Sequence, residues 1–232
     1  MNLVLIPGFM LDHSLWRDMD IALHDLGNVH YGDLAHGDTL EAMALHNLAH
    51  APDQFVLIGF SLGGYVARYM VSIAPERITA LILIASSMRD DDAAQKRSKA
   101  ASAKAIQAAS YAGLSASAIR ASVHPSRQQD HALIEHIRKM SIQLGADTFR
   151  RQLLLDRENI PVLARLSEFP VLIVAAAQDQ LRSLAEAKDL QQQFSHADLN
   201  IIADSGHMIP LEQGDALSKR IETWLGNHVL HC

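Results

Sequence analysis

The chain of 232 residues has little that would tie it to a disulfide framework, a nucleic acid or a membrane. Its one cysteine, Cys232, excludes an internal disulfide and a cysteine-based metal site. The formal net charge is −6, and no cluster of lysine and arginine offsets it, which argues against nucleic acid as a partner. No apolar run is long enough to span a bilayer, and the first residues lack the basic stretch of a secretion signal. We therefore expect a cytoplasmic protein.

What the sequence does contain is enough apolar material for one large core. Apolar residues make up 49% of the chain, which at this length predicts one domain. Six short apolar runs, typical of strands in a parallel sheet, occupy residues 3–6, 29–31, 55–58, 78–85, 171–177 and 199–203. Helical patterns lie between most of them. This alternation predicts an α/β fold with a mostly parallel, doubly wound sheet of about six strands.

Two helix starts carry the signature of a capping box. Asp38 with Glu41 precedes one amphipathic pattern, and Ser183 with Glu186 precedes another. In such a box the two side chains satisfy backbone N–H groups that the first turn leaves without partners. We expect a helix to begin at each place.

The stretch from residue 88 to residue 161 has no pattern of a buried strand. It opens with aspartates and continues with alanines and lysines, and two further helical patterns cover about 130–144 and 147–157. We predict a helical cap at 88–161, inserted before the strand at 171–177 into a core of residues 1–87 and 162–232. Ligands of open α/β sheets bind at the carboxyl ends of the strands, so a lid over that edge is expected. A helical decoration packed elsewhere is the alternative.

The residues Gly59-Phe60-Ser61-Leu62-Gly63 lie where an apolar run ends and a helical pattern begins. Gly-x-Ser-x-Gly at a strand-to-helix junction is the nucleophile-elbow pattern. A serine in so tight a turn crowds its neighbours two positions away, where a Cβ would collide, so glycine fits there. We predict that Ser61 projects its hydroxyl from the carboxyl edge of the sheet and acts as a nucleophile.

A serine hydroxyl becomes an effective nucleophile when a base accepts its proton and a third group orients that base. The chain contains 13 histidines, so position must decide among them. His207 alone follows directly on a predicted strand in a glycine-bounded loop. Asp179 follows another strand at the same edge, where it can accept the Nδ1–H of His207; Asp204 is a rival carboxylate that lies close to His207 in sequence. The order Ser61, Asp179, His207 is the one expected for a triad on such a fold.

Three stretches together resemble the α/β-hydrolase superfamily: residues 59–64, the strand ending in Gln178-Asp179, and residues 204–212. The resemblance covers the chain outside the helical cap. It implies an oxyanion hole made by the backbone N–H groups of Phe9 and Leu62, because Ile6-Pro7-Gly8-Phe9 matches the family segment after the first central strand. Pro7 stands there in place of the family's usual histidine.

An apolar pocket for the acyl or alcohol part of a substrate is expected around the nucleophile. The residues that we expect to line it flank Ser61, flank His207 or belong to the cap, and they are Met10, Phe60, Met208, Tyr111 and Met140. Each of these five residues could equally belong to the core.

These expectations point to a serine hydrolase that cleaves a small carboxylic ester through an acyl-enzyme, without a metal or an organic cofactor. A serine at the elbow, rather than an aspartate, argues against dehalogenase and epoxide hydrolase chemistry, which in this superfamily uses an aspartate nucleophile. The alternatives are a thioesterase, a lactonase or a C–C bond hydrolase with the same triad. A receptor for a small molecule that retains the triad is a further alternative, because fold alone does not fix function.

Overall fold

The computed structural model describes residues 1–157, 169–194 and 196–229. The predicted boundary between cap and core at residues 161 and 162, and the single cysteine Cys232, lie outside the described residues. Within the described part, no helix combines the length and the hydropathy needed to cross a bilayer.

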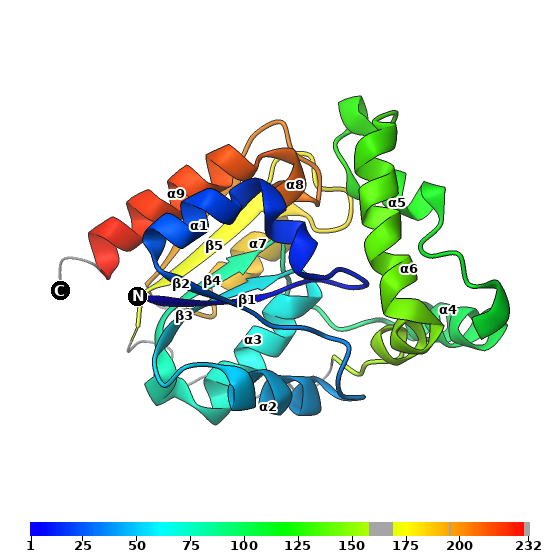
Figure 1. Cartoon of the computed structure of the whole chain (residues 1–232), viewed down its shortest axis with the longest axis horizontal. Helices are drawn as coiled ribbons and strands as arrows, with labels where there is room; N and C mark the ends of the chain where they lie inside the picture. Colours follow the sequence, from blue (N-terminus) through cyan, green and yellow to red (C-terminus); the bar gives the residue numbers. More distant parts are fainter. Residues whose placement is uncertain (158–168, 195, 230–232) are drawn as a thin grey trace.

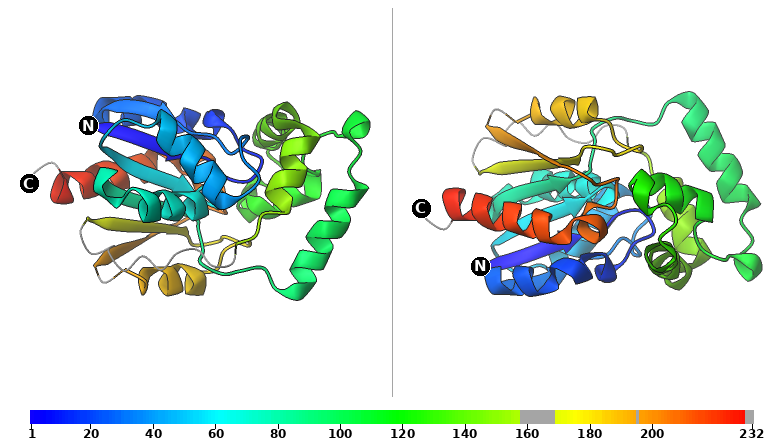
Figure 2. Two further views of the ribbon diagram at one scale, coloured as in Figure 1. Left: turned by 90° about the horizontal axis from the view of Figure 1, so that it is seen from below. Right: turned by 90° about the horizontal axis from the view of Figure 1, so that it is seen from above.

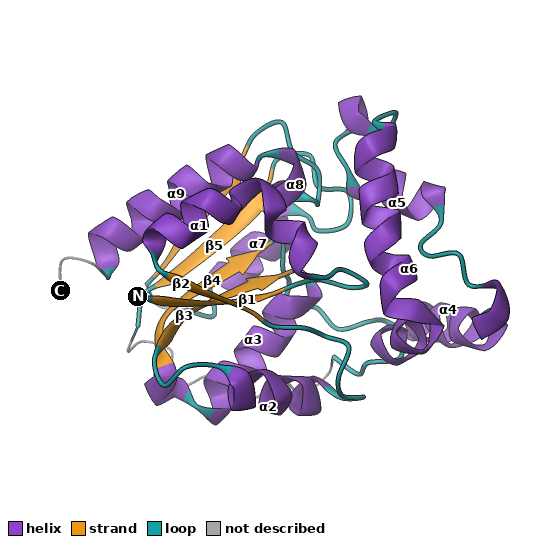
Figure 3. Ribbon diagram, in the orientation of Figure 1, coloured by secondary structure: helices purple, strands orange, loops and turns teal. Residues whose placement is uncertain are grey.

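Six strands form one sheet in the order β2-β1-β3-β4-β5-β6 (Figure 3). Every pairing between neighbouring strands is parallel, so the predicted α/β class and strand number are confirmed. Ile6 pairs with Gly59 and Gly59 with Leu83, which aligns the carboxyl ends of the three central strands. The strands are β1 Asn2–Ile6, β2 Asn28–Tyr31, β3 Phe55–Phe60, β4 Ile78–Ile84, β5 Val171–Ala176 and β6 Ala197–Ile202.

Helices cover both faces of the sheet, because successive strand residues point to opposite sides. Leu3 and Leu5 pack with α1 and α9 on one face, whereas Val4 and Ile6 pack with α2, α3 and α7 on the other. Each fully buried leucine or isoleucine stabilises the fold by about 1.5–3 kcal/mol. The flanking helices are η1 His13–Met19, α1 Asp20–Leu26, α2 Leu40–His50, α3 Leu62–Ile73, η2 Pro75–Arg77, α7 Leu184–Gln191, α8 Ile209–Glu212 and α9 Gly214–His228.

Residues 88–157, which we call the helical segment, lie between β4 and β5 in the sequence. Both views in Figure 2 show its helices beyond one end of the sheet, while the two chain termini lie near the opposite end. Because β1 runs away from the N-terminus, the helical segment is at the carboxyl end of the strands (Figure 1). Its helices are α4 Ala93–Ala105, η3 Ala108–Ser110, α5 Ala116–Ser122, η4 Pro125–Arg127 and α6 His131–Leu153.

The local predictions are partly confirmed. The two helical patterns near 130–144 and 147–157 are confirmed, because the range given for α6 consists of two helical stretches separated by a kink at Gly145, which adopts a left-handed φ of 79°. The short helices α5 and α8 have no counterpart in the predictions. Helix α2 is capped by Thr39, whose hydroxyl accepts the Ala42 N–H at 3.0 Å, so the capping box predicted at Asp38 is wrong. The box of Ser183 and Glu186 at α7 is confirmed.

Candidate active site

Ser61 sits in a strained turn between β3 and α3. Its φ is 51°, a left-handed value that non-glycine residues adopt at a cost of roughly 1–3 kcal/mol. The turn is held because the Ser61 N–H donates to the Ile84 carbonyl at 2.9 Å. A Cβ at position 59 would lie 2.7 Å from the Gly63 oxygen, and one at position 63 would lie 2.3 Å from the Pro7 oxygen. A Cβ would therefore collide at both glycines, within the turn at Gly59, as expected from the sequence, and with the end of β1 at Gly63.

The side chains of Ser61, His207 and Asp179 form one chain of hydrogen bonds. His207 Nδ1 lies 2.7 Å from Asp179 Oδ2, and His207 Nε2 lies 2.9 Å from Ser61 Oγ. A carboxylate can only accept, so Nδ1 carries the ring proton and Nε2 accepts the serine hydroxyl. The His207 side chain is 5% exposed and that of Asp179 is 1% exposed. The arrangement can move a proton from the serine hydroxyl to a ring that is oriented from behind.

The two loops that carry Asp179 and His207 are fastened to each other. The Gln178 N–H donates to the Ser205 carbonyl at 3.1 Å, and the Ser205 N–H donates to Gln178 Oε1 at 3.2 Å. Asp179 Oδ1 also accepts backbone N–H groups of its own loop at 2.7 and 2.9 Å. Asp204, the rival carboxylate, is exposed and its carbonyl accepts from Gln213. The geometry thus brings Asp179, rather than Asp204, to the histidine.

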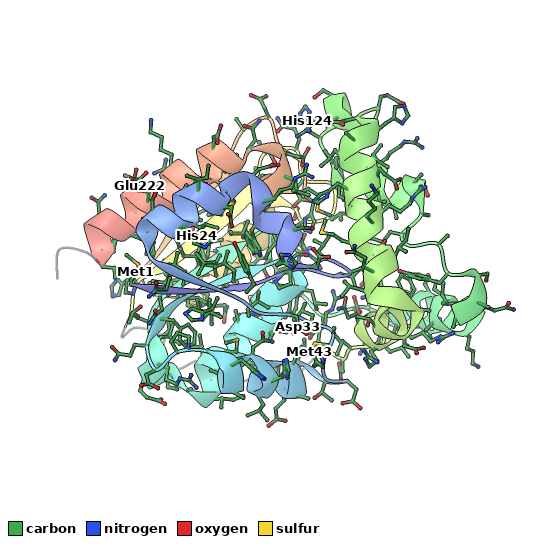
Figure 4. All side chains as sticks on the ribbon, in the orientation of Figure 1. Met1, His24, Asp33, Met43, His124 and Glu222 are labelled. Atoms are coloured by element: carbon green, nitrogen blue, oxygen red, sulfur yellow. The ribbon has the colours of Figure 1, made fainter. Side chains whose placement is uncertain are left out.

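The loop of His207 is also tied to the helical segment. The Met208 N–H donates to the Ser122 carbonyl at 3.2 Å, and Glu212 on α8 accepts the His124 N–H at 2.5 Å. His124, labelled in Figure 4, lies on the side of the helical segment toward α8. Burial raises the pKa of the Glu212 carboxyl, although the hydrogen bond from His124 opposes the shift. The partly buried carboxyl of Glu212 therefore connects the core to the helical segment.

Comparison with known protein families gives one match that spans most of the chain. A family model described as the alpha/beta hydrolase fold matches residues 7–213. The chain belongs to the α/β-hydrolase fold family.

Curated relatives of this α/β-hydrolase carry different names. A dihydrolipoyllysine-residue acetyltransferase component of an acetoin cleaving system from Pseudomonas putida is 26% identical across 97% of this chain and 64% of that protein. A pimeloyl-[acyl-carrier protein] methyl ester esterase from Klebsiella pneumoniae is 38% identical across 39% of this chain and 40% of that protein. The matches thus span about two fifths to just under two thirds of the length of these relatives.

Solved structures share the fold over nearly the whole chain. A thermophilic esterase from Thermogutta terrifontis superposes with a TM-score of 0.83 at 24% identity, covering 98% of this chain and 90% of that one. The enol-lactonase from Burkholderia xenovorans gives a TM-score of 0.82 at 17% identity, covering 97% and 91%. At these identities the likeness shows the fold.

A cavity of about 400 Å³ opens onto Ser61 and His207, and we call it the Ser61 cavity. Its apolar wall comes from the core and from α5, and includes Phe60, Ile119 and Met208. A second part of the wall is charged and is formed by Asp91, Lys99, Arg157 and Arg182. The cavity therefore joins an apolar surface to a group of ionised side chains beside the same serine.

The expected pocket residues divide into two groups. Phe60 and Met208 line the Ser61 cavity, whereas Met10, Tyr111 and Met140 are not among its lining residues. Met10 and Met140 are fully buried in the core, the alternative that the sequence left open, so for these two the pocket assignment is corrected. The Tyr111 ring contacts Phe149, which in turn contacts Phe9 of the cavity wall. The positions of Met10, Met140 and Tyr111 outside the cavity wall depend on how distant parts of the chain pack together.

The charged wall is the part of the site that sequence reasoning missed. Its residues come from four places in the chain, namely the run of aspartates before α4, helix α4, the residues after α6, and the loop after Asp179. One signal was available, because Arg182 follows a predicted strand end by a few residues and so belongs to the same sheet edge. The other charges are brought together by the fold alone.

Phe9 and Leu62, the expected oxyanion donors, both line the Ser61 cavity with Ser61. Leu62 is the first residue of α3. The loop of Phe9 is fixed from the helical segment, because the Met10 N–H donates to Gln152 Oε1 at 2.8 Å and Gln152 Nε2 donates to the Leu34 carbonyl at 2.9 Å. The Gln152 side chain is fully buried. The side-chain amide of Gln152 thus connects the loop of Phe9 and Met10 to the loop of Leu34.

One group in the described residues has the spacing of metal ligands. Asp33, His36 and His46 each offer one ligand atom, and these atoms lie within 4.8 Å of one another. Burial raises the pKa of Asp33, but hydrogen bonds from His36 and the Ala35 N–H outweigh it, so the pKa lies below its ordinary value. Asp33, labelled in Figure 4, follows β2, and none of the three residues lines the Ser61 cavity. This group is therefore separate from the hydrogen-bonded chain of Ser61, His207 and Asp179.

Proposed function

We propose that this α/β-hydrolase cleaves small carboxylic esters, with Ser61 as nucleophile, His207 as general base and Asp179 as the group that orients and stabilises the imidazolium. The observation that carries the proposal is the continuous hydrogen-bonded chain from Asp179 through His207 to a strained serine that opens onto a cavity. The relative from Klebsiella pneumoniae, which is named a methyl ester esterase, supports the same reaction class.

The proposed reaction has two stages, acylation of Ser61 and hydrolysis of the acyl-enzyme. Ser61 Oγ attacks the ester carbonyl while His207 Nε2 takes its proton. The backbone N–H groups of Phe9 and Leu62 stabilise the oxyanion, and loss of one such donor typically raises the barrier by about 3–4 kcal/mol. His207 returns the proton to the departing alcohol, which leaves an acyl-enzyme. Water activated by His207 then attacks the acyl carbon, and Ser61 recovers its proton as the acid departs.

We further propose that the helical segment acts as a lid over the Ser61 cavity. Residues of α4 and α5 line that cavity together with Ser61 and His207. A lid excludes water from the reacting atoms and shapes the space for the substrate. The cap was expected to run to residue 161, and its described part ends at residue 157.

Hydrolysis of p-nitrophenyl esters from acetate to decanoate tests the proposed function. Ser61→Ala removes the attacking oxygen, so we expect kcat to fall by roughly 10⁴- to 10⁶-fold, with the melting temperature nearly unchanged. Ser72→Ala is the matched control, because Ser72 lies in the same helix and its hydroxyl donates to the Tyr69 carbonyl. The control should keep the wild-type rate.

Each outcome of this series has a distinct meaning. A rate that depends on Ser61 and peaks at one chain length supports an esterase and sizes its acyl pocket. Undiminished turnover by Ser61→Ala would refute the nucleophile assignment. No turnover by the wild type on any ester would count against the esterase. Thioesters, lactones and C–C bonded substrates, or a receptor role with ligand binding but no turnover, would then be assayed.

A further inference from the structure

The charged wall of the Ser61 cavity carries more positive than negative charge. Three cations, Lys99, Arg157 and Arg182, line the cavity in the described part of the chain, and Asp91 is the one carboxylate among the lining residues there. A cavity that accepts neutral esters has no need of three cations beside its nucleophile. Their ion pairs and their burial decide whether the excess charge is already neutralised.

Asp91 is shared between two of the cations. Lys99 Nζ donates a hydrogen bond to Asp91 Oδ2, and Arg157 Nη1 lies 4.0 Å from Asp91 Oδ1. Arg182 has a separate partner, since its Nη1 lies 3.5 Å from Glu186 Oε1. That carboxylate is occupied by other donors, because it accepts hydrogen bonds from Ser87 Oγ at 3.0 Å and from the Ser183 N–H at 2.8 Å. Among the described residues, two carboxylates, Asp91 and Glu186, thus pair with three cations.

The three cations are partly buried, and the two arginines keep unused donors. The side chains of Arg157 and Lys99 are 10% and 23% exposed. The Nε atoms of Arg157 and Arg182 are buried without a hydrogen-bond partner among the described residues. Burial lowers the pKa of Lys99, and the repulsion of Arg157 and Arg182 lowers it further, while Asp91 opposes the shift. A buried cation with unsatisfied donors is unfavourable until an anion binds to it.

We propose that the Ser61 cavity takes an ester that carries a carboxylate, and that Lys99, Arg157 and Arg182 bind this carboxylate. The inference rests on the proposed esterase function. A planar carboxylate matches the fork of N–H donors on an arginine and can accept two hydrogen bonds from it. The apolar wall around Phe60 and Met208 then holds the remaining carbon chain. The substrate class is therefore a half-ester or another acidic ester, with one end ionised.

Pairs of esters that differ in one charge test this proposal. Mono-(p-nitrophenyl) glutarate is compared with p-nitrophenyl pentanoate, and 4-acetoxybenzoate with phenyl acetate, so that the carboxylate lies on the acyl side in one pair and on the alcohol side in the other. We expect kcat/KM for the charged ester to exceed that of its neutral partner by at least about tenfold in one pair, the size of one hydrogen bond to an ionised group.

Variants of the cations locate the effect. Lys99→Met and Arg182→Gln should each reduce the ratio of charged to neutral kcat/KM by about tenfold. Lys104→Met is the matched control, because Lys104 is an exposed residue of the same helix that is not among the cavity's lining residues. The control should keep the wild-type ratio. Equal kcat/KM for both members of both pairs, with turnover dependent on Ser61, would overturn the proposal and leave the esterase intact.

A binding measurement separates failure of this proposal from failure of the proposed function. Calorimetric titration of Ser61→Ala with monomethyl glutarate and with dimethyl glutarate requires no turnover. The singly charged ester should bind at least about tenfold more tightly, and the added substitution Lys99→Met should remove the difference. Equal affinities, or no binding of either compound, would refute the carboxylate site even if no ester were hydrolysed.

Discussion

Helices α3 and α4 both contribute to the Ser61 cavity, yet they are built in opposite ways. Nine of the 12 residues of α3 are buried, whereas in the 13 residues of α4 only Ala103 is buried. Helix α3 is fixed by packing against the sheet and α2. Helix α4 is held at its start by a capping box of Asp92 and Gln95, and by the ion pair of Lys99 with Asp91.

The difference separates two tasks in the molecule. The side chains of the proposed chemistry lie in short loops and turns that follow the core strands β3, β5 and β6. The side chains proposed to select the substrate come partly from a helix with few buried contacts, and such elements open locally at low free energy. Substitutions in α4 should therefore change substrate preference without unfolding the protein, and substitutions under α3 should do the reverse.

The strongest test of this contrast is Gly63→Ala in α3. The new Cβ would lie 2.3 and 2.4 Å from the backbone oxygens of Pro7 and Ile6, and backbone cannot move aside without displacing the central strand β1. We expect a loss of unfolding free energy of about 3 kcal/mol or more. Gly226→Ala in α9 is the control, because nothing lies within 4 Å of its Cβ. There the substitution should stabilise by about 0.5–1 kcal/mol.

Urea unfolding of the two glycine variants measures the difference directly. Equal urea midpoints for Gly63→Ala and Gly226→Ala would show that the backbone around Ser61 and Gly63 can shift to accommodate a Cβ. The rigidity assigned to α3 would then be wrong.

A smaller, pH-dependent effect is expected at Glu212 on α8, which connects the core to the helical segment through His124. Its pKa is raised in the folded state, so the folded state binds the proton more tightly than the unfolded state does. The stability that this group contributes is present below its unfolded pKa and is lost as pH rises through the raised value. Glu212→Gln cannot ionise and keeps an acceptor for the His124 N–H. Its stability relative to the wild type should therefore increase from pH 4 to pH 8.

Thermal unfolding of both proteins across that pH range checks the sign. A difference in melting temperature that stays constant, or that falls as pH rises, would contradict a raised pKa at Glu212.

The smallest expected change in global stability is for Asp92→Ala at the start of α4. Loss of the cap should destabilise this helix by about 1 kcal/mol, because Asp92 accepts the N–H groups of Ala94 and Gln95 at 2.8 Å. The helix should fray before the protein unfolds, so the urea midpoint should change little while amide exchange at residues 94–96 accelerates. A fall in the urea midpoint as large as that for Gly63→Ala would erase the distinction between the two helices.

The features that local sequence determines were predictable. Apolar runs located all six strands, and the glycines around Ser61 indicated a turn whose crowding the structure contains. Asp179 and His207 could be placed at one edge because each follows a strand, and the fold brings them within hydrogen-bonding distance. These inferences needed only short-range pattern and the rule that parallel strands end at a common edge.

Other features depended on a choice between two plausible local arrangements, and sequence patterns alone do not determine that choice. Asp38 and Thr39 are both good capping residues, and the choice of Thr39 depends on how the loop before α2 enters the helix. Met10 follows Phe9, which lines the Ser61 cavity, but Met10 itself is fully buried and has a backbone φ of 55°. Lys99, Arg157 and Arg182 line one cavity although Lys99 and Arg182 are 83 positions apart in the sequence. Only the folded chain brings these three residues together.

The hydrogen bonds of Gln152 have a consequence for how this chain could be recombined with its relatives. Gln152 belongs to α6 in the helical segment, yet its amide supports the loop of Phe9 in the core. The helical segment is therefore not an interchangeable module. A chimera that imported another protein's residues 88–157 would leave the Met10 N–H and the Leu34 carbonyl without partners, unless the graft supplied an amide at position 152. Replacement by a relative's sequence is thus restricted in α6, which contains Gln152, and less restricted in α4.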